Sequence, residues 1–144
     1  MKAQELRLGN YTQDQDGNVL VVDGLESDKI DFKVVDRSKF PLKDGWKAEP
    51  IPINQDWLKK AGFEYAEGLR MLVMQPEFEL CGPDDYEDSV YHHIFFYHSG
   101  DSFGFEVSNE WGETGNAMLS KIKYVHQLQN LYFALTGEEL RLQL

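Results

Sequence analysis

The sequence predicts an α+β fold, with antiparallel strands in both halves, one short helix and one long C-terminal helix. Apolar and polar residues alternate over residues 29–35 and 102–108, a pattern typical of half-buried strands. Apolar residues recur at helical spacing near residues 118–136, and Thr136-Gly137 is a typical helix stop. Aromatic residues make up 13% of the chain, which favours strands with dense packing between them.

The first half of the chain predicts a small antiparallel meander and then a short helix. The expected strands cover residues 6–11, 19–22 and 29–35. Asp, Asn and Gly residues between them favour turns. Prolines make residues 37–53 a loop or a sheet edge, because proline cannot donate to a ladder. The short helix is expected near residues 55–61, after the cap residue Asn54 and before Gly62.

The second half predicts further strands before the long helix. These strands are expected over residues 69–74, 77–81, 90–98 and 102–108. Ser99-Gly100-Asp101 marks a tight hairpin between the last two. Residues 109–116 are expected to form a loop. The long helix is then expected to pack on the sheet of this half.

The chain is predicted to be a single domain over residues 1–144, with residues 1–48 and 49–144 as candidate sub-lobes. No repeat or linker divides it. Its one cysteine, Cys81, cannot form an internal disulfide, so we expect a reducing, cytoplasmic compartment. The opening residues lack the apolar run of a signal peptide, and no run of 18 apolar residues predicts a membrane-spanning helix.

The net charge of −11 is concentrated in the second half. Residues 1–70 carry 13 acidic and 11 basic side chains, whereas residues 71–144 carry 12 acidic and 3 basic ones. Nucleic-acid binding needs clustered cations, so direct binding through the second half is disfavoured. Two interpretations of the acidity remain open. The negative charge either keeps the protein soluble, or it forms a face that binds a basic protein partner. A related possibility is that the acidic face mimics DNA and occupies a nucleic-acid-binding protein.

The histidines offer one candidate for chemistry. His92 and His98 fall on one face of the expected strand, about 20 Å apart, and His93 falls on the other face. A site that joins a histidine to Glu106 is conceivable, because the two strands should pair. Neither an HExxH nor a paired CxxC spacing occurs, so we predict no metal site and no cofactor. A small metal-dependent or hydrolytic enzyme that uses His92, His93 or His98 with Glu106 stays as the alternative function.

Two further patterns give no support for catalysis. Cys81 precedes Gly82-Pro83 without a motif that would activate it, so an inert buried thiol is expected. Neither GxxxxGK[ST] nor GxGxxG occurs, so a phosphate-binding loop of either kind has no support.

An acidic loop next to aromatic residues is the predicted binding surface, centred on residues 82–113. The residues that we assign to it are Asp84, Asp85, Glu87, Asp88, Tyr91 and Trp111. The carboxylates lack the pattern of a calcium-binding EF-hand loop. A solvated loop and aromatic residues buried in the core are the competing interpretation.

Three separated segments carry a resemblance to known proteins. They are Glu5–Tyr11 (ELRLGNY), Glu49–Phe63 (EPIPINQDWLKKAGF) and Lys121–Leu140 (KIKYVHQLQNLYFALTGEEL). Together they resemble a group of uncharacterised proteins of gut anaerobic bacteria and their phages or prophages. The resemblance implies a bacterial or phage setting in the cytoplasm, and it implies no activity and no catalytic residue. The favoured function is a non-enzymatic binding or adaptor protein of a bacterial or phage system, which acts through the acidic, aromatic surface centred on residues 82–113.

Overall fold

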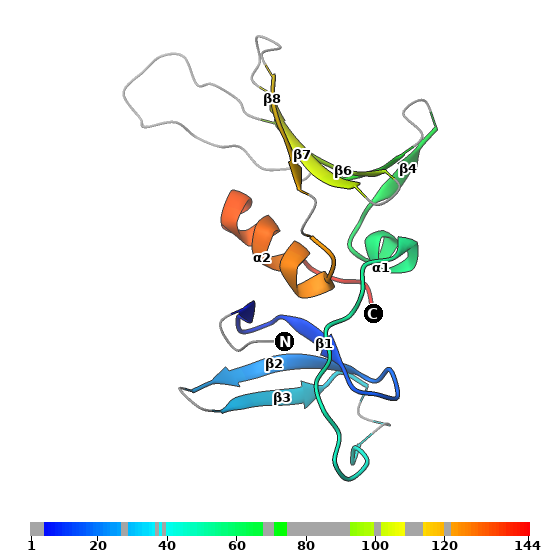
Figure 1. The fold of residues 1–144 in the computed structure, drawn as a ribbon, viewed down its shortest axis with the longest axis vertical. Coiled ribbons are helices and arrows are strands. Elements are labelled where there is room, and N and C mark those ends of the chain that lie inside the picture. The colour runs from blue at the N-terminus through cyan, green and yellow to red at the C-terminus, as the bar shows by residue number, and fades with distance from the viewer. Residues whose placement is uncertain are drawn as a thin grey trace. The chain divides into compact units, whose positions relative to one another are not determined.

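The computed structural model describes residues 5–26, 29–36, 38, 40–67, 71–74, 93–99, 102–108, 114–119 and 122–144. Its antiparallel sheets and two helices confirm the predicted α+β class (Figure 1). The chain divides into two compact units. The first comprises Met1–Asn54 and Lys123–Leu140, and the second comprises Gln55–Ile122 and Arg141–Leu144. The chain thus leaves the first unit after Asn54 and returns to it at Lys123.

A three-stranded antiparallel sheet forms the base of the first unit, in the order β1-β2-β3. β1 covers Tyr11–Gln13, β2 covers Val19–Leu25 and β3 covers Ile30–Val34. The predicted meander is confirmed, although its first strand begins at Tyr11 and not at residue 6. Gly9 explains the shift, because its φ of 83° turns the chain just before β1.

Asp14 builds the turn between β1 and β2. Its buried carboxylate accepts hydrogen bonds from the backbone N–H of Asp16 at 2.9 Å and of Asn18 at 2.8 Å. The side-chain amide of Asn18 donates a third bond, also at 2.8 Å. Burial alone would raise the pKa of Asp14, but these bonds favour the charged form and hold its pKa below the ordinary value. The turn is therefore fixed by one side chain.

The long helix α2 covers Val125–Thr136, which corrects the predicted start near residue 118. Residues before it stay extended because they pair with the segment that leaves the first sheet. The backbone N–H of Ile53 donates to the carbonyl of Lys123 at 2.9 Å. Helical spacing of apolar residues continues upstream of the true start, so it does not mark where the helix begins. This long-range pairing marks the start, together with the side chain of Gln127, which accepts the backbone N–H of Tyr124 at 3.2 Å.

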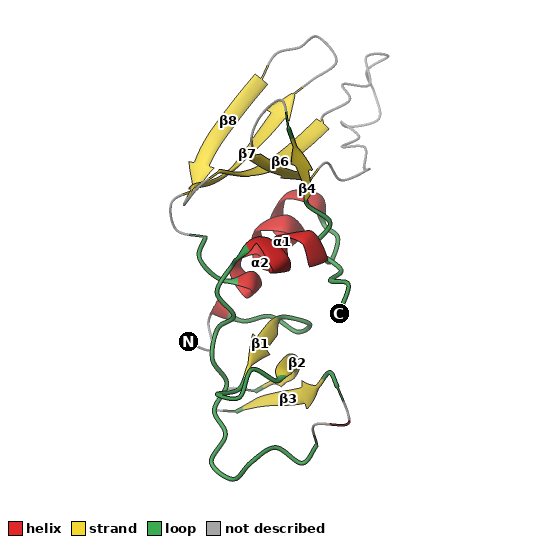
Figure 2. Ribbon diagram, turned by 90° about the vertical axis from the view of Figure 1, so that its right-hand side faces the viewer, coloured by secondary structure: helices red, strands yellow, loops and turns green. Residues whose placement is uncertain are grey.

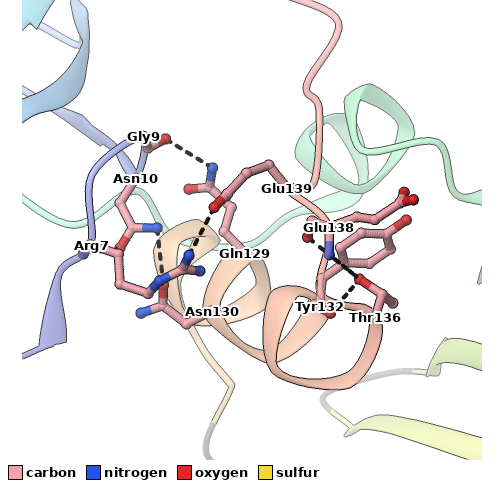
Figure 3. Close-up of polar contacts among 9 residues, drawn as sticks. All are labelled: Arg7, Gly9, Asn10, Gln129, Asn130, Tyr132, Thr136, Glu138 and Glu139. Atoms are coloured by element: carbon pink, nitrogen blue, oxygen red, sulfur yellow. Dashed lines mark hydrogen bonds and ion pairs between the residues drawn. The ribbon is translucent and has the colours of Figure 1, made fainter.

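α2 contacts β1 in the first unit, whereas the sequence predicted packing on the sheet of the second half. Gln129 makes the contact specific (Figure 3). Its Oε1 accepts the backbone N–H of Tyr11 at 2.8 Å, and its Nε2 donates to the carbonyl of Gly9 at 3.2 Å. Beside it, Asn10 donates to the side-chain oxygen of Asn130 at 3.0 Å. A glutamine amide thus satisfies backbone groups that a neighbouring strand would otherwise bind.

The predicted helix stop is confirmed. Gly137 adopts a left-handed φ of 75°, and its N–H donates to the carbonyl of Phe133 at 2.8 Å. The hydroxyl of Thr136 donates to the carbonyl of Tyr132 at 2.9 Å and accepts the N–H of Glu138 at 3.0 Å (Figure 3). These bonds satisfy the free end of the helix.

The second unit combines a short helix with a five-stranded antiparallel sheet in the order β4-β5-β6-β7-β8. Its elements are α1 (Gln55–Lys60), β4 (Glu64–Ala66), β5 (Met71–Met74), β6 (His93–Ser99), β7 (Ser102–Ser108) and β8 (Thr114–Leu119). The predicted short helix is confirmed, and Gly62 follows it with a φ of 88°. The predicted hairpin is confirmed as well, because Ser99 pairs with Ser102; β6 and β7 lie side by side with β8 in Figure 2.

Strand β8 corrects the expected loop over residues 109–116. It pairs with β7 along its whole length, from Thr114 opposite Ser108 to Leu119 opposite Phe103. Its glycine and asparagine have low strand propensity, so pairing with β7 and not local preference forms it. The strand expected over residues 77–81 lies outside the described residues.

Both units bury apolar side chains. The most deeply buried ones in the first unit are Leu20, Val22, Ile51, Val125 and Leu128, and in the second they are Leu58, Phe63 and Phe96. Within the described residues, neither helix has the length and apolar character that crossing a membrane requires.

Candidate functional site

A hollow of about 760 Å³ lies in the first unit, beside β3 and the loop that follows it. Its size is within the usual range for ligand sites. The residues that line this β3 pocket are Asp23, Phe32, Lys33, Val34, Phe40, Pro41, Leu42, Lys43, Asp44, Gly45 and Trp46. All of them belong to the first unit, so the pocket is complete within one compact part of the chain.

Aromatic rings give the pocket its apolar character. The ring of Trp46 meets the ring of Phe32 edge to face, with centroids 5.8 Å apart and an interplanar angle of 87°. Phe40 stands nearby and is 71% exposed, the highest exposure of any large hydrophobic residue among those described. An exposed phenyl ring beside this edge-to-face pair leaves apolar surface available to a ligand.

The turn between β1 and β2 holds the pocket loop in place. The ammonium of Lys43 binds the carboxylate of Asp16 at 2.9 Å. The side chain of Gln15 accepts the backbone N–H of Lys47 at 3.0 Å. Gly45 has a φ of 75° and lets the loop turn, so that the Trp46 N–H donates to the carbonyl of Lys43 at 3.2 Å. Contacts distant in sequence therefore place Trp46 against β3.

The charges around the pocket are balanced. Lys43 is neutralised by Asp16, whose hydrogen bond and charge raise the pKa of the lysine. Lys33 is exposed and forms no ion pair with any residue that the structure describes. Asp23 and Asp44 contribute carboxylates to the lining. Because neither sign dominates, the pocket is suited to a ligand held by apolar and backbone contacts rather than by charge.

The two edges of the first sheet differ. Along β1, the outward groups of Gln13 are bonded, because its N–H donates to Glu49 at 2.9 Å and its carbonyl accepts from Glu49 at 2.7 Å. Gln129 covers the rest of that edge through Tyr11 and Gly9. β3 is the opposite edge of the sheet, and among the residues that the structure describes it pairs with β2 alone. The pocket therefore lies at the edge that the first unit leaves open.

The predicted binding surface lies outside the described residues. This applies to each of its members: Asp84, Asp85, Glu87, Asp88, Tyr91 and Trp111. Cys81 and His92 lie outside them as well. The prediction of an acidic, aromatic surface over residues 82–113 consequently stays a prediction.

The strand register of the second sheet separates His98 from Glu106, one of the combinations considered for the histidine site. Glu106 pairs with Phe95, and His98 pairs with Phe103, an odd number of positions away. Successive residues of a strand point to opposite faces, so His98 and Glu106 lie on opposite faces of the sheet. His93 pairs with Ser108, two positions from Glu106. Within the described residues, no three His, Cys, Asp or Glu side chains gather as metal ligands would.

His126 is a buried histidine whose environment the sequence did not reveal. It is 1% exposed, its ring stacks on that of Tyr124 at 5.8 Å, and neither ring nitrogen has a hydrogen-bond partner in the part of the chain that the structure describes. Burial lowers its pKa below the ordinary value, and the charge of Glu5 opposes this only in part. The neutral ring is thus the folded form.

Replacing His126 with phenylalanine should raise the free energy of unfolding by about 1 kcal/mol at pH 7.5, because a buried polar group without a partner is removed. In the native protein, the unfolded chain takes up a proton first as the pH falls below about 6.5, so stability should decrease there. Urea denaturation at pH 7.5, 6.5 and 5.5 measures both effects. Equal pH dependence in the two proteins would contradict this account, since the carboxylates titrate in both.

Comparisons with known proteins add no relative. No protein-family model matches the chain, and no curated protein or solved structure is significantly similar to it. The candidate site therefore depends on the geometry of this chain alone. One overlooked signal for this site is that Phe40-Pro41 and Gly45-Trp46 place large apolar residues in a loop that faces solvent.

Proposed function

We propose that this chain is a non-enzymatic binding or adaptor protein, and that its first unit binds a partner in the β3 pocket. The observation that carries the proposal is the exposed Phe40 beside the edge-to-face rings of Phe32 and Trp46. Exposed apolar surface that lines a hollow is typical of interaction sites, because burying it on binding is favourable.

The acidic, aromatic surface over residues 82–113 is a second contact in this proposal. Its carboxylates would attract a basic protein partner and make association sensitive to salt. The resemblance of the three segments adds a bacterial or phage system as the setting. No metal or cofactor is required for either contact.

Partner capture with matched variants tests the proposal. Tagged full-length protein is used to capture proteins from a lysate of the native bacterium, and each captured protein is quantified by mass spectrometry. We expect Phe40→Ala and Trp46→Ala to reduce capture of the partner at least tenfold, which corresponds to about 1.4 kcal/mol. Tyr65→Ala is the control, because Tyr65 is a 60% exposed aromatic residue of β4 outside the pocket.

A charge-reversal variant in the same capture experiment separates the two contacts. Reversing the charges of Asp84, Asp85, Glu87 and Asp88 to lysine should weaken capture at low salt if the acidic loop takes part. Equal capture by the native protein and both pocket variants would contradict a role for the β3 pocket. Loss of capture only on charge reversal would place binding at the acidic loop instead.

A further inference from the structure

The backbone of β3 faces the pocket, and this determines what kind of ligand fits. Phe32, Lys33 and Val34 are consecutive residues, and all three line the hollow. Consecutive side chains of a strand point to opposite faces, so a hollow that reaches all three extends around the edge of the strand. Figure 2 shows the loop after β3 passing below that edge.

The hydrogen bonds of β2 show which backbone groups of β3 point outward. Val22 donates its N–H to Asn10 at 2.9 Å and accepts the N–H of Gly9 at 2.8 Å, so both its backbone groups point toward the β1 side. Val22 lies opposite Phe32. In an antiparallel ladder, two such opposed residues direct their backbone groups away from each other. The N–H and C=O of Phe32 therefore point to the open edge.

Val34 has the same orientation as Phe32, because the alternation continues along the strand. Next to it, Val35 donates its N–H to the carbonyl of Val19 at 3.0 Å, toward β2. No described residue bonds to the outward backbone groups of Phe32 or Val34. Two donors and two acceptors of β3 thus have no partner among the described residues.

We infer that the β3 pocket binds an extended peptide segment of a partner protein, which adds to the sheet as a fourth strand beside β3. This inference rests on the proposed binding function and names its ligand class. The peptide backbone bonds to Phe32 and Val34 about 4.8 Å from β3, the spacing of paired strands. A large apolar side chain of the peptide packs on Phe40 and on the Phe32–Trp46 pair.

The two sheet edges explain why the peptide binds at β3. Gln129 and Glu49 already occupy the backbone groups of β1, so no strand can add there. Proteins usually protect an exposed edge with charge, prolines or a covering segment. β3 has Asp31 and Lys33 on one face, but its other face carries Phe32 and Val34 toward an open hollow. An edge that is flanked by apolar surface favours pairing with another chain.

A displayed library of random 12-residue peptides, selected on the immobilised full-length protein, tests this inference. Selected peptides are synthesised, and their affinity is measured by titration calorimetry. Trp46→Ala should weaken binding at least tenfold, and Tyr65→Ala should leave it unchanged. Proline replacements along the peptide should abolish binding at every second position, since only alternate N–H groups point toward β3.

Amide hydrogen exchange, followed residue by residue by NMR, identifies the binding mode. The amides of Phe32 and Val34 should exchange at least tenfold more slowly in the complex. The amide of Lys33 is the internal control, because it already points toward β2. If peptides bind without slowing Phe32 and Val34, or if proline replacement shows no alternation, strand addition is refuted.

Two other outcomes would also overturn the inference. The first is that no selected peptide loses affinity in the Trp46→Ala variant, which would refute peptide binding in the pocket. The proposed binding function would still stand in that case if Phe40→Ala reduced capture from the lysate. Protection of Phe32 and Val34 that appears with protein concentration in the absence of peptide would assign the edge to a second copy of this chain. Light scattering at the same concentrations would then show a dimer.

Discussion

Replacing Gln129 with methionine should lower the free energy of unfolding by about 3 kcal/mol. Methionine preserves the length and much of the volume of the side chain, so the loss isolates the two hydrogen bonds. Gln129 is 1% exposed, and its amide is bonded to Tyr11 at 2.8 Å and to Gly9 at 3.2 Å. Without the amide, a donor and an acceptor of the backbone lose their partners beneath α2, and each such loss costs about 1–3 kcal/mol.

Urea denaturation followed by circular dichroism measures the change for Gln129→Met. Gln129→Glu separates the two bonds, because a carboxylate can still accept the N–H of Tyr11 but cannot donate to Gly9. Gln55→Met is the matched control, since Gln55 is an exposed residue of α1. The amide of Tyr11 should exchange faster in Gln129→Met alone. An unchanged unfolding midpoint, or a loss as large in Gln55→Met, would show that Gln129 does not hold α2 on β1.

The sequence identified the buried face of α2 but not what that face contacts. The face predicted from helical spacing comprised Met118, Ile122, Val125, Leu128, Gln129, Tyr132 and Leu135. Val125, Leu128, Gln129 and Tyr132 are buried, Leu135 is half-buried, and Met118 and Ile122 precede the helix. Helical spacing is a local property, so it can be read from the sequence. The strand that a helix contacts is set by bonds such as that from Tyr11 to Gln129, over a separation of 118 residues. No pattern within either segment encodes that pairing.

The β3 pocket was missed for a related reason. Its rings come from a strand and from a loop that looked like ordinary turn sequence. The loop is positioned by Asp16 and Gln15, which bind Lys43 and Lys47 from the turn between β1 and β2. By contrast, β3 and β7 were predicted because alternation is visible within each of them, and β2 and β6 were predicted from their runs of apolar and aromatic residues.

Parts of the three segments singled out in the sequence lie in the first unit, namely residues 5–11, 49–54 and 123–140. Ile53, in the second of them, bonds to Lys123, in the third. Arg7, in the first, binds Glu139 at 2.8 Å, and its guanidinium lies 3.6 Å from the centre of the Phe133 ring. None of the residues that line the β3 pocket lies in these segments.

Replacing Gly104 with valine should lower the free energy of unfolding by about 3 kcal/mol, because overpacking a filled site costs roughly 1–3 kcal/mol. Gly104 is buried in β7 opposite Tyr97 of β6. A Cβ atom at this position would lie 2.5 Å from Cζ and 2.6 Å from the hydroxyl oxygen of Tyr97. The ring thus covers the space that a side chain would need. Glycine is required here by the close approach of that ring, although it is otherwise unfavourable in strands.

A double-mutant cycle shows whether Tyr97 causes that cost. Gly104→Ala should be destabilising by about 2 kcal/mol in the native background, since even one methyl group meets the ring. In the Tyr97→Ala background the same change should cost less than about 0.5 kcal/mol, because the ring is gone and alanine limits the unfolded chain more than glycine does. The measurement is urea denaturation of all four proteins at one pH. If Gly104→Ala cost the same in both backgrounds, the strain would lie in the backbone of β7, and the pairing of Tyr97 with Gly104 would not be what fixes the register of the hairpin.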